Sequence, residues 1–137
     1  MDAVVQSFVA GFPVLLTHFS VTIAMLILGV TIYIWITPHK DVALVREGNV
    51  AAAISLSGAV LGLAIPLAMS MSVSANVADI VIWGILTLAI QLIAFRLADL
   101  LLRDLSTRIE AGEVAAALLL SAIKLAVAAI AAAAVSG

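Results

Sequence analysis

Long apolar stretches separated by short polar connections dominate this chain. Four stretches are each long enough to cross a bilayer, which takes about 20 apolar residues; they cover roughly residues 13–37, 49–72, 77–102 and 113–135. A span must be helical or part of a closed barrel, and apolar runs of this length indicate helices. The pattern predicts an all-α membrane protein with four transmembrane helices, in a single integral membrane domain over residues 1–137.

A phrase at the start of the second stretch recurs at the start of the fourth. Residues 48–61 are GNVAAAISLSGAVL and residues 112–125 are GEVAAALLLSAIKL, which align without a gap at an offset of 64 residues. Each copy belongs to a unit of two spans joined by a charged connection. We therefore expect two tandem helical hairpins, about 13–72 and 77–136, that form a parallel rather than an inverted repeat.

Prolines and asparagine set the expected ends and bends of these helices. Pro13 suits the first helical turn, and Pro38 cannot continue the first helix. The apolar residues before Pro13 either add turns of helix or lie at the membrane interface. Asn49 is a favourable N-cap for the second helix. Pro66 lies inside that helix, where it is expected to cause a kink and to leave the carbonyl of Gly62 without its usual donor.

Small residues are concentrated in the second and fourth spans, whereas the first and third hold most of the bulky side chains. Helices in a membrane associate through close packing, so the second and fourth spans are expected to form the centre of the bundle. The same small-residue surface could pack against another subunit, and we expect a homo-oligomer. The expected repeat and packing positions are Gly48, Asn49, Gly58, Gly62, Pro66 and Gly112.

Composition supports the membrane assignment. Apolar residues make up 66% of the chain and charged residues 10%, and the mean hydropathy is +1.35. Soluble domains are typically about 45–50% apolar and about 25% charged, so this composition places the chain among membrane proteins. A net charge of −2 argues against a nucleic-acid surface. The lipid bilayer is the first expected partner.

The positions of the basic residues give an expected orientation. Lys40 and Arg46 lie in the first connection, and Arg96, Arg103 and Arg108 lie in or beside the third. The N-terminal tail, the 72–77 turn and the C-terminus contain no lysine or arginine. The positive-inside rule therefore predicts that both charged connections are cytoplasmic and both termini external.

Few residues suggest chemistry. The chain has no cysteine, no pairing of a nucleophile with a base, and no histidine–carboxylate cluster with metal-ligand spacing. We therefore expect no enzymatic activity, no catalytic residue, no metal and no cofactor.

Gln91 and Lys124 are the polar residues expected near the centres of the third and fourth spans. A lysine at a helix centre costs roughly 2.5–3.5 kcal/mol on insertion scales. No carboxylate is expected at the centre of any span. Lys124 is therefore expected to be neutral, to face water or a neighbouring subunit, or to share polar contacts with Gln91 and exposed carbonyls. We expect it to point into the protein.

Arg96, Asp99 and Arg103 fall at i, i+3 and i+7, on one helical face at the end of the third span. This spacing predicts an interfacial charge stripe, with Asp99 and Arg103 at the cytoplasmic surface. Thr107 and Glu110 have the spacing of a capping box and predict the start of a short helix.

Charged residues of the two connections form the expected surface for a cytoplasmic protein partner. They are Lys40, Asp41, Arg46, Glu47, Arg103, Asp104, Arg108 and Glu110.

The segment EGNVAAAISLSGAVLGLAIPL, its echo AGEVAAALLLSAIKLAVAAI and the four-span length resemble the YjfL family of bacterial inner-membrane proteins, the domain of unknown function 350. The most specific element is the segment from Gly48 to Ile54; the second copy has Glu113 in place of asparagine and Leu118 in place of isoleucine. The family has no established activity. Its genes often lie near PspA-type membrane-remodelling proteins and ligase-like enzymes, which implies an envelope-stress or membrane-maintenance role.

These features are consistent with two functions. The leading one is a non-enzymatic, oligomeric inner-membrane protein that scaffolds an envelope-stress system through its cytoplasmic connections. The alternative is a small oligomeric channel or transporter with a polar path past Gln91 and Lys124.

Overall fold

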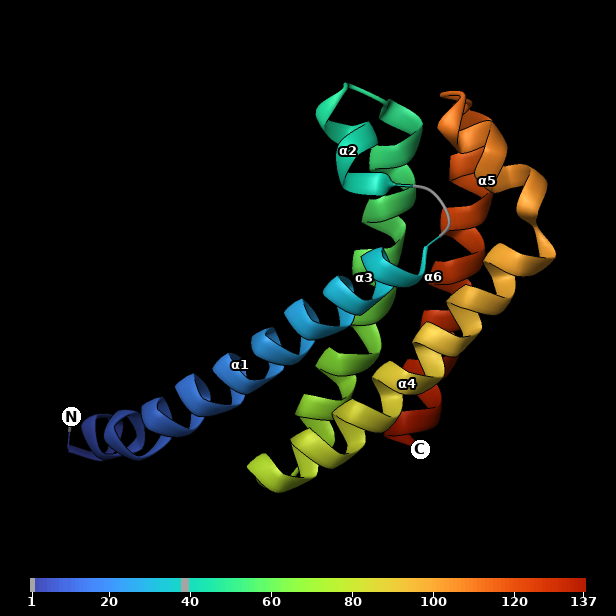
Figure 1. Ribbon diagram of the computed structural model, residues 1–137. Coiled ribbons are helices and arrows are strands. Elements are labelled where there is room, and N and C mark those ends of the chain that lie inside the picture. Colours follow the sequence, from blue (N-terminus) through green and yellow to red (C-terminus); the bar gives the residue numbers. More distant parts are fainter. Residues whose placement is uncertain (1, 38–39) are drawn as a thin grey trace.

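The protein is a bundle of helices. The computed structural model describes residues 2–37 and 40–137. Within these residues the helices are α1 (Asp2–Ile36), α2 (Asp41–Arg46), α3 (Val50–Val73), α4 (Val77–Leu101), α5 (Arg103–Glu110) and α6 (Val114–Ser136) (Figure 1). In this part of the chain, α1, α3, α4 and α6 are long and apolar enough to cross a membrane. The predicted all-α fold with four helices suited to span a membrane is confirmed.

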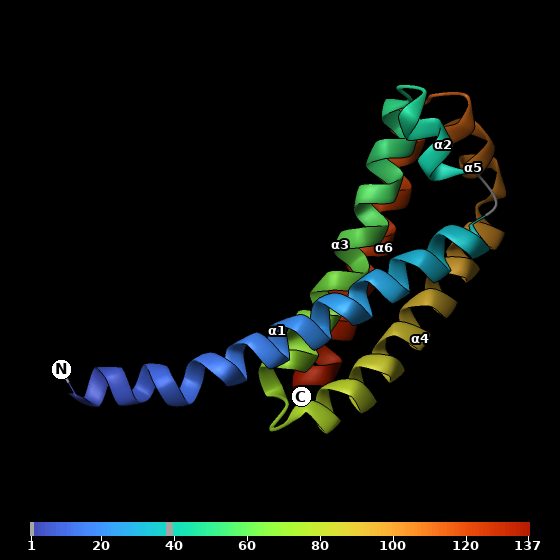
Figure 2. The same cartoon turned by 60° about the vertical axis from the view of Figure 1, so that its left-hand side comes forward.

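The helices α3 and α6 form the centre of the bundle and make its most extensive contact. Both begin beside α2 and α5 and run toward the opposite end, where the C-terminus lies (Figure 1). The helices α1 and α4 cross the pair diagonally (Figures 1 and 2). In the most apolar window of each helix, half of the α3 residues but only 17% of the α1 residues are buried. The expected central position of the second and fourth spans therefore agrees with the structure.

The first helix is longer than its predicted span. It begins at Asp2, so Pro13 lies in its interior rather than at its first turn, and this part of the prediction is wrong. Of the two alternatives for the residues before Pro13, the structure shows added turns of helix. The far half of α1 is exposed and extends away from the bundle (Figure 1). Pro38, the expected end of this helix, lies outside the described residues.

The short helices α2 and α5 lead into α3 and α6 through similar turns. Gly48 has a φ of 87° and Gly112 a φ of 89°, a region in which side chains are strained. Both glycine N–H groups donate to the carbonyl three residues back, at 3.0 and 2.9 Å. Asn49 caps α3, as expected, because its Oδ1 accepts from the N–H of Ala52 at 3.0 Å. Glu113 makes no such side-chain cap for α6.

Close approach of α3 and α6 depends on the small residues between them. A Cβ added to Gly58 would lie 2.5 Å from the Oγ of Ser121 and 2.9 Å from its Cα. The Ser121 hydroxyl donates to the carbonyl of Ile54 at 2.8 Å, which joins the two helices. Gly62, one turn further along, packs against the Phe95 ring. Gly58 and Gly62 therefore pack against other helices of the same subunit.

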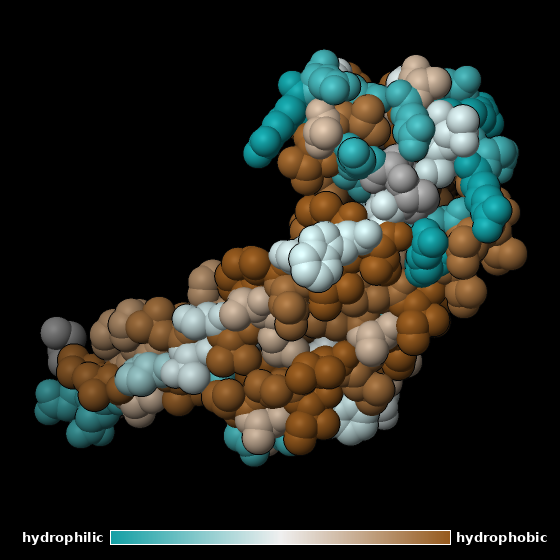
Figure 3. All heavy atoms as spheres, viewed as in Figure 1, coloured by the Kyte–Doolittle hydropathy of each residue, from teal (hydrophilic) through white to brown (hydrophobic). Residues whose placement is uncertain are grey.

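The outer surface has an apolar body and a polar end. Figure 3 shows apolar residues covering the long helices and hydrophilic residues gathered over α2 and α5. Exposed large apolar side chains include Phe8, Ile27, Trp35, Ile93 and Ile130. Membrane-embedded helices with this surface contact the lipid bilayer.

Candidate functional site

Lys124 lies near the middle of α6 and is completely buried inside the bundle. Its Nζ donates to the hydroxyl oxygen of Tyr33 on α1 at 2.6 Å and lies 3.1 Å from Oδ1 of Asp99 on α4. Tyr33 and Asp99 are 1% and 2% exposed. Lys124 thus points into the protein, but its partners are a carboxylate and a phenol rather than the carbonyls, water or Gln91 considered from the sequence.

The position of Asp99 corrects the predicted interfacial stripe. Arg96 is half-buried and Arg103 exposed, but Asp99 is inside the bundle. The helix α4 ends at Leu101, and Leu102 breaks it with φ −119° and ψ 48°. Arg103 therefore begins α5, and the face expected to run from Arg96 to Arg103 on one continuous helix does not exist. The predicted start of a helix at Thr107 is also wrong, because that residue lies within α5.

Asp99 reaches Lys124 because α5 adds length before the chain turns into α6. The end of α4 lies beside the middle of α6, and α5 lies beside the first turns of α6 (Figure 1). Tyr33 reaches the same level because α1 ends at Ile36, and α2 occupies the corresponding place beside α3 (Figure 1). The helical spacing predicted Asp99 at the cytoplasmic surface and Lys124 near the centre of the fourth span, so this contact was not expected.

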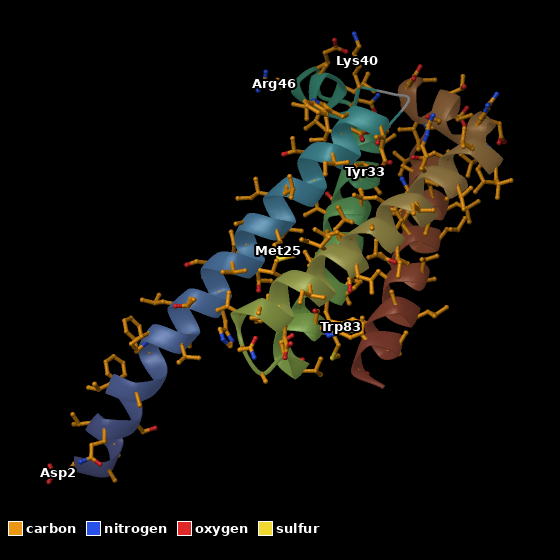
Figure 4. All side chains as sticks on the ribbon, turned by 60° about the horizontal axis from the view of Figure 1, so that its bottom comes forward. Asp2, Met25, Tyr33, Lys40, Arg46 and Trp83 are labelled. Atoms are coloured by element: carbon orange, nitrogen blue, oxygen red, sulfur yellow. The ribbon has the colours of Figure 1, made fainter. Side chains whose placement is uncertain are left out.

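Aromatic rings surround the ammonium group. The Phe95 ring centre is 5.5 Å from the Lys124 Nζ. The Tyr33 and Phe95 rings meet edge to face at 6.2 Å. Figure 4 shows Met25 and Tyr33 on the side of α1 that faces the other helices, and both side chains are buried. The Tyr33 and Phe95 rings cover the ammonium group, whereas Met25 packs further along α4, beside Gly84.

A second polar contact lies at Gln91, about two helical turns along α4 from Asp99. The Gln91 Nε2 donates to the carbonyl of Gly62 at 3.0 Å, and this is the carbonyl that Pro66 leaves without a backbone donor. The Gln91 Oε1 is buried without a hydrogen-bond partner among the described residues. Phe95 lies between Gln91 and Asp99 on α4, four residues from each. Gln91 and Lys124 are therefore near one another, but the described hydrogen bonds do not join them.

Pockets approach this region from both ends of α4. One, of about 300 Å³, includes Asp99 in its wall and lies between the last turns of α4 and α5. Its other lining residues are Arg96, Leu100, Arg103, Ser106, Thr107 and Glu110. A second, of about 500 Å³, lies between the first half of α4 and the end of α6 and is lined by Asp79, Trp83, Thr87 and Ile90 among others. Trp83 marks this end of α4 in Figure 4.

One row of α4 side chains connects the two pockets. Every fourth residue from Asp79 belongs to it: Asp79, Trp83, Thr87, Gln91, Phe95 and Asp99. Thr87, Gln91, Phe95 and Asp99 are each 5% exposed or less. The row therefore places polar groups through the interior, interrupted by the apolar Phe95 ring.

The polar end of the molecule carries most of the predicted partner surface. Asp41 is an exception: it is 1% exposed, and its charge acts on both Tyr33 and Lys124. It belongs to the interior rather than to the surface. The other predicted surface residues are exposed: Lys40, Arg46, Glu47, Arg103, Asp104, Arg108 and Glu110. Asn49 joins the two connections, since its Nδ2 donates to the carbonyls of Ile109 and Glu110 at 3.2 Å.

Tyr33 is the member of the site that sequence analysis missed entirely. It is the only tyrosine in the chain and lies near the end of an apolar span. A buried lysine requires a counterion or polar partners, and this requirement alone could have directed attention to Asp99 and Tyr33. Residues 2–37 and 40–137 contain no group of three or more histidine, cysteine or acidic side chains arranged to hold a metal ion.

Comparison with known proteins gives one family and two curated relatives. The model of the family "Domain of Unknown Function (DUF350)" matches residues 7–135. The chain is 37% identical over 78 residues to the "UPF0719 inner membrane protein YjfL" of Escherichia coli strain K12 and to the protein of the same name from strain O157:H7. Each alignment covers 57% of this chain and 59% of the relative. No solved structure matches the chain.

Proposed function

The chain belongs to the family Domain of Unknown Function (DUF350), and we propose that it is a non-enzymatic, multi-pass protein of the bacterial inner membrane. Its proposed activity is to provide a narrow path for small ions along α4, past Gln91 and Lys124. The inner-membrane assignment rests on the name of the curated relatives and on the four apolar helices.

The buried Lys124–Asp99 pair carries this proposal. Ionisable residues inside membrane helices are costly and mark ion paths or proton relays in many membrane proteins. This pair lies between pockets at the two ends of α4, with further polar groups in the same row. A buried ion pair is often no more stabilising than apolar residues of the same volume. Stability therefore gives little reason to place a lysine and an aspartate here.

Reconstitution in lipid vesicles tests the path. The purified protein is assayed for proton, Na⁺, K⁺ and Cl⁻ flux, beside vesicles without protein. We expect flux from the unmodified protein, loss of flux in Lys124→Met, and unchanged flux in Lys40→Met, which removes the exposed lysine of the polar end. Absence of flux for all four ions would rule out the path.

A scaffold for an envelope-stress system is the second candidate, favoured by the way the two connections are joined. Asn49 holds the start of α3 against the end of α5, so the exposed charges of α2 and α5 form one surface. A photo-crosslinking residue at Arg46 or Arg108 is expected to give a defined product with a protein partner in cells. The same residue at Ile130, which is exposed among the apolar side chains, serves as the control. Products identical to those of the control would count against a docking surface.

The positive-inside rule supports an orientation in which α2 and α5 face the cytoplasm. Basic residues of the polar end include Lys40, Arg46, Arg103 and Arg108, and both termini are then external.

Two features support an internal duplication. The turns at Gly48 and Gly112 have nearly equal φ angles, and α3 and α6 run in the same direction (Figure 1). Residues 13–72 and 77–136 are the proposed repeats; Gln91, Asp99 and Lys124 lie in the second copy and Tyr33 in the first.

A homo-oligomer is the proposed assembly. The first half of α1 extends from the bundle with its side chains exposed, including the stacked rings of Phe8 and Phe12. A neighbouring subunit in contact with this arm would bury it. The mass of the detergent-solubilised protein, compared with that of a variant lacking residues 2–12, tests this assembly: equal subunit numbers would exclude a contribution of the arm.

A further inference from the structure

We propose that the ion carried along α4 is a proton, exchanged between Asp99 and Lys124, and that Phe95 is the gate between this pair and the Gln91 end of the path. The inference rests on the proposed function and adds the identity of the ion and the groups that handle it. The proposal rests on the arrangement of buried polar groups around Phe95. The carboxylate, ammonium and phenol of Asp99, Lys124 and Tyr33 lie on one side of the ring, and the amide of Gln91 lies on the other.

The contact distances fit proton transfer. Asp99 lines the pocket beside α5, its Oδ1 is 3.1 Å from the Lys124 Nζ, and that Nζ is 2.6 Å from the Tyr33 hydroxyl. Protons move between groups at such distances without needing a channel wide enough for an ion. Because Asp99 lines this pocket, the pocket is the proposed route by which water delivers a proton to Asp99, the first acceptor.

The same geometry disfavours other small ions. Phe95 packs so closely on α3 that a Cβ on Gly62 would lie 2.6 Å from its ring, which leaves no space for a hydrated ion. A metal cation would also have to pass the fixed ammonium of Lys124 in a poorly polarisable interior, where like charges repel strongly. An anion would meet the carboxylates of Asp99 and Asp41.

Titratable and charged groups face the pair from most of the surrounding helices. They are Tyr33 from α1, Asp41 from α2, Arg96 from α4, and Arg103 and Glu110 from α5. The helix α3 contributes no titratable side chain, since none occurs between Val50 and Val73. Among these groups, Asp41 is a further buried carboxylate whose charge acts on Lys124.

Protons and charges balance over the proposed transfer cycle. Asp99 accepts a proton from water in the α5 pocket and becomes neutral. Lys124 then releases one proton to water that reaches it from the Gln91 side, and becomes a neutral amine. The proton on Asp99 passes across the 3.1 Å contact to the amine, which restores the carboxylate and the ammonium. One proton has entered and one has left.

Phe95 controls the second of these steps. Its ring occupies the segment of α4 between Gln91 and Asp99, and it lies against Tyr33 and Gly62. In this position it separates Lys124 from water that approaches through Thr87 and Gln91. Rotation of the ring away from Gly62 would join the two polar regions, so proton release requires movement of Phe95.

Proton flux into vesicles, driven by a pH gradient and followed with an enclosed pH-sensitive dye, tests the proposal. We expect flux in the unmodified protein, its loss in Asp99→Asn and in Lys124→Met, and an increased leak in Phe95→Ala. Phe19→Ala, which shortens an exposed ring on α1, is the matched control and should leave flux unchanged. The double variant Asp99→Leu/Lys124→Met, which removes both charges together, should remain folded and carry no protons.

The outcomes separate this inference from the function on which it rests. If no ion of the four crosses the vesicle membrane, the ion path itself is wrong. If K⁺, Na⁺ or Cl⁻ crosses and protons do not, the path stands and the proton inference is wrong. Proton flux at the original rate in the folded double variant would also overturn the inference, because the exchanging pair would then be unnecessary. A leak in Phe95→Ala no larger than in the control variant would overturn the gate.

Discussion

The Lys124 ammonium on α6 lies 3.1 Å from the Asp99 carboxylate on α4, and neither side chain is exposed. The pair joins two helices that start at opposite ends of the bundle (Figure 1). Because each charge is buried, each depends on the other for its stability.

Removal of one charge should destabilise the fold more than removal of both. Breaking a buried pair typically costs about 3–5 kcal/mol, because the remaining charge is left without a partner. We expect a loss of this size for Lys124→Met alone or Asp99→Leu alone, and a smaller loss for the double variant. Thermal unfolding of the four proteins in detergent gives the comparison. Additive losses in the double variant would show that the two charges do not depend on each other.

Gln91 should matter to stability only while Pro66 is present. Gln91→Leu leaves the buried carbonyl of Gly62 without its donor, at a cost of about 1–3 kcal/mol. Pro66→Ala supplies a backbone N–H four residues after Gly62, so the same change in that background should cost much less. A double-mutant cycle of unfolding free energies measures the difference. Equal costs in the two backgrounds would mean that the Gln91 bond does not replace the missing backbone donor.

Gly58→Ala should weaken the contact between α3 and α6. The added methyl group would lie 2.9 Å from the Ser121 Cα, and this backbone atom can move only if the helices separate. Overpacking of this kind costs about 1–3 kcal/mol. Gly11→Ala is the control, because a Cβ there meets no atom within 4 Å and alanine favours a helix over glycine by roughly 0.5–1 kcal/mol. Unfolding curves should therefore shift in opposite directions.

The orientation can be tested with single cysteines, since the chain has none of its own. Cysteines at Ser74 and Ser136 should react with an impermeant thiol reagent added outside intact cells. A cysteine at Glu47 should not react until the membrane is opened; this exposed position is preferable to the buried Asp41. Labelling only at Glu47 would reverse the orientation.

The sequence predicted the helices themselves, but not how far along one helix the end of another helix lies. Apolar length predicted four membrane-spanning helices, and small residues predicted the contact at Gly58, because both properties are local to a segment. The partner of Lys124 depended instead on where α4 ends relative to α6. That level is set by the break at Leu102 and by the length of α5, neither of which follows from hydropathy.

The burial of Asp99 is the clearest example of what the local sequence pattern does not predict. Two arginines at helical spacing made a surface stripe the natural interpretation, and nothing in that local pattern distinguishes a solvated carboxylate from a buried one. Pro66 shows the opposite case. The carbonyl it frees was predictable from helix geometry, and Gln91 was already one of the two intramembrane polar residues considered.

The length of α1 couples the Lys124–Asp99 pair to the thickness of the surrounding bilayer. A helix of 35 residues is about 52 Å long at 1.5 Å per residue, whereas the hydrocarbon layer is about 30 Å thick. Such a helix must tilt steeply or lie partly along the surface, and its angle changes with bilayer thickness. Tyr33 is on the same helix, so a change of angle at the lipid-exposed arm moves the phenol against Lys124. We therefore expect the same protein to give different proton flux in vesicles of short-chain and of long-chain lipids, because the tilt of α1 differs between them.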